Sequence, residues 1–213
     1  MQKNSNLTLS GPDLAALLCS RVCHDVISPV GAISNGLELL DEGGADAEAM
    51  DLIRTSARNA SVRLKFARLA FGASGSAGAS IDTGEAENVV RDFAAADKKA
   101  VVTWSGPRAI IAKNKVKLLL NLYLTANAAI PRGGHIDIVL EDIETAPRFR
   151  ISARGSMLRV PPEFLQIHSA QFEDAINAHS VQAYYTVLLA QEAGMDIGIT
   201  ATPEEIVFTA EPA

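Results

Sequence analysis

Cysteine, histidine and aromatic residues are scarce in this chain of 213 residues. The two cysteines, Cys19 and Cys23, do not have the CxxC spacing of a metal or redox pair, and no second ligand pair lies near them. A disulfide-stabilised fold and a structural metal site are therefore not expected. We expect both cysteines to be small core or flanking residues of one helix in a reducing compartment.

A basic excess is also lacking. The net charge of −6 argues against a nucleic-acid binder, which needs a positive surface to follow phosphates. No apolar run approaches the roughly 20 residues that cross a bilayer, and residues 1–10 have no signal-peptide core. We expect a cytoplasmic globular protein of one or two domains, with neither nucleic acid nor membrane as a partner.

Two amphipathic segments open the chain. Ser10-Gly11-Pro12-Asp13 is typical of a helix start, and Asp41-Glu42-Gly43-Gly44 of a helix break. Before and after the break, apolar residues recur every three or four positions, as they do on the packed face of a helix. These residues are Ala15, Cys19, Val22, Val26, Pro29 or Val30, Ile33, Leu37 and Leu40, then Met50, Ile53, Ala57, Ala60, Leu64, Ala67 and Phe71. The pattern predicts an antiparallel helical hairpin.

A hairpin of two helices leaves each apolar seam half covered. Helical bundles close their cores with about four helices, so we expect two copies to pair as a homodimeric four-helix bundle. The alternative is that the rest of the same chain covers the seam.

The remaining sequence mixes helix and strand patterns behind a Gly/Ser-rich stretch. We predict an α+β protein with a disordered N-terminus (1–10), a helical hairpin (11–73), a linker (74–81) and an α/β sandwich domain (82–213). The expected helices of this domain cover Glu85–Lys98, Lys113–Ile130 and Val181–Ala193. The expected strands cover Ala100–Trp104, His135–Glu141, Arg148–Ala153, Ile197–Thr200 and Ile206–Phe208.

His24 opens the most informative stretch, His24-Asp25-Val26-Ile27-Ser28-Pro29-Val30. At about 100° per residue, the apolar positions of the first helix centre opposite His24, so its imidazole faces solvent. Neutral imidazole is a competent nucleophile near pH 7, so we predict that His24 is a phosphoryl acceptor. The positions that share its side of the helix are mostly small or polar, and we predict that they form a docking rim for another protein. They are Leu17, Ser20, Arg21, Ser28, Gly31 and Asn35.

Asp25 is the second predicted catalytic residue. Its carboxylate is expected to bond one ring nitrogen of His24, which fixes the tautomer and leaves the other nitrogen as the nucleophile. Arg21 is expected to neutralise an incoming phosphoryl group or to pair with an acidic partner, although a plain surface arginine is nearly as consistent with its position. We assign no chemistry to His135, His168 and His179, which lie in unrelated local contexts.

The heptapeptide resembles the H-box of sensor histidine kinases, and the hairpin resembles their dimerisation and phosphoacceptor domain. The C-terminal domain is similar to their ATP-binding domain in its order of elements. Within Lys117–Ile130, Asn127 is the nearest match to the magnesium-binding asparagine of those kinases.

The nucleotide-binding parts of that family are missing. Where a kinase has Asp-x-Gly-x-Gly, this chain has Ala153-Arg-Gly-Ser-Met157. The stretch His179–Tyr185 contains no glycine, and bulky Tyr184 and Tyr185 do not offer the bare backbone amides that a triphosphate needs. We therefore predict no ATP binding, and no cofactor or metal held by this chain alone.

A hairpin with an H-box joined to a degenerate ATP-binding domain resembles the ChpT-type histidine phosphotransferases of the alphaproteobacterial cell-cycle relay. The resemblance implies that His24 receives a phosphoryl group from the receiver aspartate of a CckA-like hybrid kinase. It also implies transfer to CtrA-like and CpdR-like response regulators, whose receiver domains supply Mg²⁺. An active ATP-dependent kinase core and a non-catalytic dimeric scaffold are the alternatives.

Overall fold

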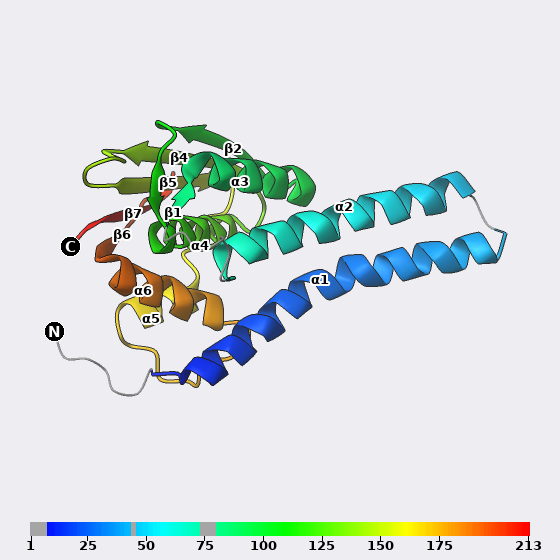
Figure 1. Cartoon of the computed structure of the whole chain (residues 1–213), viewed down its shortest axis with the longest axis horizontal. Helices are drawn as coiled ribbons and strands as arrows, with labels where there is room; N and C mark the ends of the chain where they lie inside the picture. The colour runs from blue at the N-terminus through cyan, green and yellow to red at the C-terminus, as the bar shows by residue number, and fades with distance from the viewer. Residues whose placement is uncertain (1–7, 44–45, 73–79) are drawn as a thin grey trace.

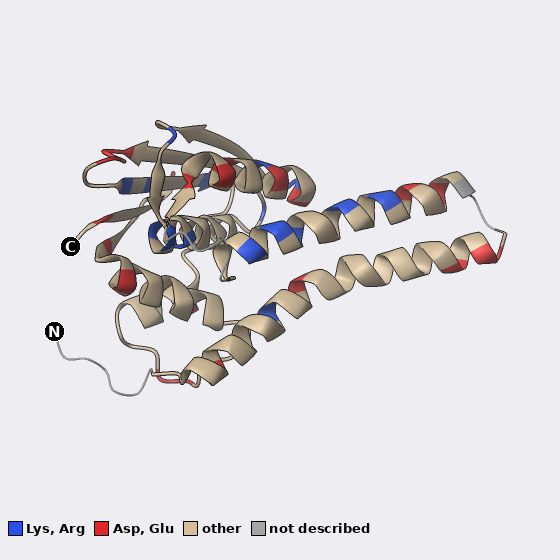
Figure 2. Ribbon diagram, viewed as in Figure 1, with Lys and Arg blue, Asp and Glu red and all other residues tan. Residues whose placement is uncertain are grey.

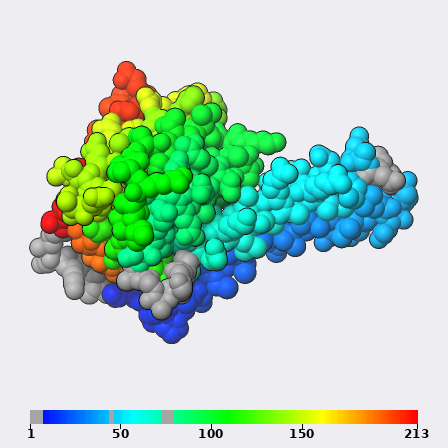
Figure 3. All heavy atoms as spheres, turned by 45° about the horizontal axis from the view of Figure 1, so that its top comes forward, coloured from blue at the N-terminus to red at the C-terminus, as the bar shows by residue number. Residues whose placement is uncertain are grey.

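A computed structural model describes residues 8–43, 46–72 and 80–213 and has the expected mixed architecture (Figure 1). Helices α1 (Gly11–Asp41) and α2 (Asp46–Ala70) form a hairpin, and the rest of the chain forms a separate α/β body. The space-filling view shows the far half of the hairpin projecting from this body (Figure 3). The predicted α+β fold class is confirmed.

Helix α1 begins where its capping residues place it. The Ser10 hydroxyl accepts a hydrogen bond from the backbone N–H of Asp13 at 3.2 Å, which satisfies one of the free amides of the first turn. The helix stays continuous through Pro29 but changes direction about midway along its length (Figure 1). An internal proline removes one backbone hydrogen bond and crowds the preceding turn, and this accounts for the bend.

The two helices pack closely where α1 carries Gly36. A Cβ atom at this position would lie 2.6 Å from Cγ1 of Ile53 on α2, so only glycine fits without a shift of one helix. Gly36 is buried, whereas Gly31, one turn and a half earlier, is exposed and has open space around it. Packing within the chain therefore accounts for Gly36 but not for Gly31.

The apolar seam predicted for α1 divides into two faces. One face packs against α2 and includes Val22, Ile33 and Leu40, which are partly buried. The other face is exposed and includes Cys19, Val30 and Leu37 of the predicted seam, together with Cys23 and Ile27, which were not part of it. The expectation of a single packed seam was therefore too simple, because one neighbouring helix covers only part of the apolar arc. Of the two positions expected for the cysteines, core or flank, their exposure excludes the core.

The C-terminal domain is a two-layer α/β sandwich, as predicted. Its elements are β1 (Ser80–Asp82), α3 (Thr83–Asp97), β2 (Ala100–Ser105), β3 (Ile110–Ala112), α4 (Lys113–Ala129), β4 (Gly134–Glu141), β5 (Arg148–Gly155), α5 (Pro162–His168), α6 (Val181–Ala193), β6 (Met195–Ala201) and β7 (Ile206–Pro212). The five-stranded sheet has the order β2-β4-β5-β7-β6, in which only the β2–β4 pair is parallel. Strands β1 and β3 form a separate antiparallel pair.

Helices α3, α4 and α6 cover one face of the sheet (Figure 1). Helix α4 lies at the centre of the core, where Leu118, Leu119 and Leu120 are fully buried together with Tyr123. Helix α6 ends at Gly194, whose φ of 61° is the left-handed conformation that favours glycine at a helix end. The sheet and its helices thus close an apolar core within one chain.

Two predicted boundaries need correction. Residues 8–10, expected to be disordered, are held in place, because Leu9 donates its backbone N–H to the Tyr184 hydroxyl and Ser10 caps α1. Ser80 and Ile81, expected in the linker, belong to β1 because they pair with β3. The rest of the predicted linker (74–79), like residues 1–7, lies outside the described residues.

Candidate functional site

His24 lies near the middle of α1, and its side chain is 70% exposed. Its Nδ1 atom is 3.3 Å from Oδ1 of Asp25, as the sequence predicts for a carboxylate that orients the ring. Among the described residues, no hydrogen bond to Nε2 of His24 is found. The geometry therefore holds one ring nitrogen and leaves the other available as a nucleophile.

The second oxygen of Asp25 is also engaged. Oδ2 accepts a hydrogen bond from Nε of Arg21 at 3.1 Å, one helical turn earlier, and both side chains are about one-third exposed. One carboxylate thus bridges a guanidinium and the imidazole. Arg21 is a fixed member of this arrangement, and it lines the adjacent cleft.

The predicted docking rim is mostly accessible. Ser20, Ser28, Gly31 and Asn35 are exposed around His24, whereas Leu17 and Arg21 are partly buried. The Ser20 hydroxyl bonds back to the carbonyl of Ala16 at 3.0 Å and so presents little polar surface. The rim is open to an approaching protein, and its role in docking remains a prediction.

His179, to which the sequence assigned no chemistry, lies beside His24, the predicted phosphoacceptor. The centroids of the His179 and His24 rings are 6.0 Å apart, with an edge-on angle of 76° between the planes. His179 comes from the loop before α6, so the fold joins the hairpin and the C-terminal domain at this point. No local pattern in the sequence could have indicated this proximity.

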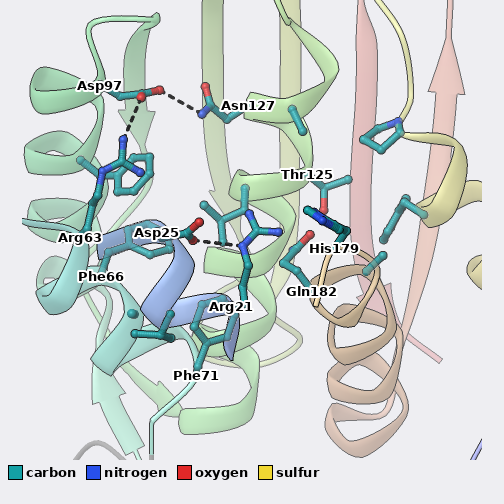
Figure 4. Close-up of a pocket in the computed structure, with 18 of the residues that line it drawn as sticks. Arg21, Asp25, Arg63, Phe66, Phe71, Asp97, Thr125, Asn127, His179 and Gln182 are labelled. Atoms are coloured by element: carbon teal, nitrogen blue, oxygen red, sulfur yellow. Dashed lines mark hydrogen bonds and ion pairs between the residues drawn. The ribbon is translucent and has the colours of Figure 1, made fainter. Parts of the chain in front are cut away.

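A cleft of about 440 Å³ separates the hairpin from the C-terminal domain next to this pair. Figure 4 shows Arg21 and Asp25 in the middle of the cleft, with His179 and Gln182 on one side and Asp97 on the other. Oδ2 of Asp97 accepts a hydrogen bond from Nδ2 of Asn127 at 3.3 Å, and Oδ1 of Asp97 lies 3.6 Å from Nη2 of Arg63. The polar groups of the cleft are thus largely bonded to one another.

The residues that replace the kinase nucleotide motifs have structural partners. The Tyr184 hydroxyl accepts from Leu9, and the Tyr185 hydroxyl accepts from Nζ of Lys117 at 3.2 Å. Burial raises the pKa of Tyr185 to about 12, and nearby Glu192 adds to the shift. Burial lowers the pKa of Lys117, with a smaller contribution from Lys113 and an opposing one from Glu192.

Asn127, the counterpart of the magnesium-binding asparagine, lines the cleft, and its buried Oδ1 atom has no partner. The described part of the chain contains no group of three histidine, cysteine or acidic side chains that could hold a metal ion. That this chain holds no nucleotide or metal by itself stays a prediction.

Side chains of α4 bond the last carbonyls of the hairpin. Fully buried Asn121 donates from Nδ2 to the carbonyl of Ala70 at 3.2 Å, and Lys117 donates to the carbonyl of Phe71 at 3.4 Å. These carbonyls have no partner within α2, because they end the helix. The contacts fix the C-terminal domain to the base of the hairpin, close to the site.

Length and composition alone would allow α1 to cross a membrane, contrary to the expectation that no segment approaches a membrane span. Among the described helices it is the one that meets this criterion, which helices of soluble proteins also meet. Arg21, His24 and Asp25 lie near its middle, where charged groups are expensive in hydrocarbon. The observation therefore gives no support for a membrane span.

Comparison with known proteins gives matches that extend over nearly the whole chain. Protein phosphotransferase ChpT of Brucella abortus (strain 2308) is 63% identical over 206 residues, which are 96% of this chain and 98% of that protein. The structure of a bacterial phosphotransferase superposes with a TM-score of 0.91 at 61% identity and covers 96% of this chain and 98% of that one.

A histidine kinase domain from Erythrobacter litoralis EL346 aligns with a TM-score of 0.48 and 11% identity, over 84% of this chain and 94% of that one. A family model described as the histidine phosphotransferase C-terminal domain matches residues 83–205, and it agrees with the two close relatives. The chain belongs to the histidine phosphotransferase family.

Proposed function

We propose that this protein is the phosphotransferase of a bacterial His–Asp phosphorelay, in which His24 takes a phosphoryl group from one receiver domain and passes it to another. The observation that carries this proposal is an exposed imidazole whose Nδ1 is held by Asp25 while Nε2 has no described hydrogen bond. Such an arrangement suits a nucleophile that must be reached by a second protein.

The chemistry follows from the two ring nitrogens. The lone pair of Nε2 attacks the phosphorus of a receiver aspartyl phosphate in line with the scissile bond. The N–P bond forms as the aspartyl O–P bond breaks, and the aspartate carboxylate leaves with the bonding electron pair. The ring then carries a positive charge, with its proton on Nδ1, and the adjacent carboxylate of Asp25 stabilises this charge. Transfer to the next receiver reverses these steps.

Phosphoryl transfer passes through a loose transition state, so positioning and charge neutralisation dominate its catalysis. The receiver domain supplies Mg²⁺ and a lysine in this proposal, and the present chain supplies no cofactor. Its own contribution is an oriented nucleophile on one helix of a hairpin whose other helix, α2, is bonded to the C-terminal domain.

The proposed partners follow from the relationship to ChpT. The donor is the receiver domain of a CckA-like hybrid histidine kinase, and the acceptors are CtrA-like and CpdR-like response regulators. The reaction takes place in the cytoplasm, where these regulators act.

The test is to incubate the protein with labelled ATP alone and, separately, with a CckA-like receiver domain that carries a labelled phosphoryl group. We expect acid-labile label on the protein only in the presence of the receiver, and none on His24→Ala. His135→Ala, which removes another exposed histidine, serves as the control and should be labelled normally. Label from ATP alone would establish the kinase alternative, and no label in either case would leave the scaffold alternative.

We further propose that the protein is a homodimer paired through the exposed face of α1. On this face Ile27, Val30 and Leu37 are 70%, 47% and 51% exposed, although all three are large apolar residues. Figure 2 shows hardly any charge along α1 between the site and the tip of the hairpin. A second copy of the same face would bury this strip and complete a four-helix bundle.

The dimer can be tested by sedimentation of the full chain. We expect Leu37→Gln to raise the dissociation constant by at least tenfold, because it places an amide in an apolar interface. The control is Leu165→Gln on α5, a leucine of similar exposure away from α1, which should leave the constant unchanged. A wild-type protein that sediments as a monomer at micromolar concentration would contradict the proposal.

A further inference from the structure

The imidazole of His179 is placed next to the phosphoacceptor without a part in the chemistry described so far. Its ring centroid is 6.0 Å from that of His24, and the two rings meet edge-on. In the described part of the chain, no hydrogen bond joins the two side chains. The two rings are thus near enough for a group carried by one ring to reach the other.

The backbone of His179 is held by a tight turn before α6. Oδ1 of Asn177 accepts hydrogen bonds from the backbone N–H groups of His179 and Ser180, at 2.8 and 3.2 Å. In return, the Ser180 hydroxyl accepts from the N–H of Asn177 at 3.0 Å. His179 is therefore presented to the hairpin from a fixed position and not from a loosely held loop.

Two other cationic side chains near His24 already have acidic partners. Arg21 donates to Asp25, and Arg63 lies 3.6 Å from Asp97. His179 is exposed, lines the same cleft, and has no side-chain hydrogen bond or ion pair among the described residues (Figure 4). Its ring N–H is therefore available as a donor, whereas the two arginines are each held by a carboxylate.

We infer that His179 donates an N–H hydrogen bond to an oxygen of the phosphoryl group carried by His24. This role rests on the proposed function, since it requires a phosphorylated His24. His179 neither gains nor loses a covalent bond in this step. Negative charge is spread over the three equatorial oxygens during transfer, so a donor placed there stabilises the transition state in both directions.

The experiment compares His179→Ala and His179→Gln with wild type and with the control His135→Ala. Transfer from the phosphorylated CckA-like receiver domain to the full chain is followed at increasing receiver concentration. We expect His179→Ala to lower the rate constant at saturating receiver by about tenfold, while the receiver concentration at half-maximal rate stays unchanged. Glutamine keeps an N–H donor, so His179→Gln should recover part of the rate.

A second readout does not involve the receiver. The ³¹P resonance of phosphorylated His24 reports the pKa of the phosphoryl group, and a donor favours the more highly charged form. Arg21 and Asp25 also face this group and are kept in every variant. We expect the phosphoryl pKa to be higher in His179→Ala than in wild type or in His135→Ala.

Rates and ³¹P titrations equal to wild type in His179→Ala would overturn the inference but leave the proposed function intact. So would a variant that loses only affinity for the receiver, because that result makes His179 a docking contact. Failure of the wild-type protein to accept any phosphoryl group would instead overturn the proposed function.

Discussion

The hairpin and the C-terminal domain differ in how much of their apolar surface is buried within the chain. The main buried cluster takes only Phe66, Leu69 and Ala70 from the hairpin, and everything else comes from the C-terminal domain. By contrast, six of the ten exposed large hydrophobic residues in the described chain belong to the hairpin. The C-terminal domain thus closes its own core, whereas the hairpin presents apolar surface that other chains can cover.

The largest expected effect comes from breaking the core that the two regions share. Phe66 of α2 is 2% exposed and packs against Phe93 and Tyr123, at centroid distances of 4.8 and 5.9 Å. Phe66→Ala should lower the free energy of unfolding by about 3–5 kcal/mol, because it leaves a cavity. Denaturant unfolding followed by circular dichroism measures this. Leu64→Ala, on the exposed side of the same helix, should cost less than about 0.5 kcal/mol in the monomer.

The next effect tests the polar attachment between the regions. Asn121→Ala removes the donor to the Ala70 carbonyl and leaves buried groups unsatisfied, so it should lower the free energy of unfolding by about 1–3 kcal/mol. The partly buried Asn114, whose exposed hydrogen bond goes to the carbonyl of Glu192, offers a matched control with a much smaller loss. Equal losses of unfolding free energy in the two variants would show that the bond from Asn121 to the hairpin stabilises the protein no more than a surface hydrogen bond does.

Two glycines of α1 should respond in opposite directions. Gly36→Ala forces Ile53 aside and should destabilise the hairpin by about 1–3 kcal/mol. Gly31→Ala meets open space and should stabilise the free protein by about 1 kcal/mol through helix propensity. Chemical denaturation of both variants measures these changes. An assay of phosphoryl transfer from a receiver domain to Gly31→Ala shows whether docking needs a glycine at this position. Stabilisation with unchanged transfer would remove Gly31 from the docking rim.

The smallest effect is a pH dependence confined to the C-terminal domain. The His168 ring stacks on Phe164 with 6.0 Å between centroids, and burial lowers the pKa of His168 below its usual 6.5. The unfolded chain then binds more protons in this range, so the stabilising contribution is present above pH 6.5 and is lost as the pH falls toward the folded-state pKa. The decrease in melting temperature between pH 7.5 and pH 5.5 should therefore be smaller in His168→Gln than in wild type. An equal fall in both would show that His168 has no part in the acid response.

Much of the fold could be predicted from the sequence, since long helices carry many periods and clear capping residues. Helix α4 and strands β4 and β5 differ from their predicted limits by two residues or fewer. The three-residue strands β1 and β3 were not predicted, because so few residues show no alternation.

The site was predicted where its chemistry is local. His24 and Asp25 are neighbours in the chain, and their contact is found. The pairing of Arg21 with Asp25 was missed although its i, i+4 spacing signals it. The approach of His179 could not be predicted, because it depends on how α6 packs against the hairpin.

The bonds from α4 to the end of α2 bear on how receivers are selected. They help to hold His24, the proposed phosphoacceptor, and the surface of the C-terminal domain at one separation and angle. A receiver whose shape matches both surfaces gains the second contact at high effective concentration once the first has formed. A receiver that matches only one surface gains no such advantage. A fixed angle between two surfaces that each bind weakly therefore gives selectivity that neither surface has alone.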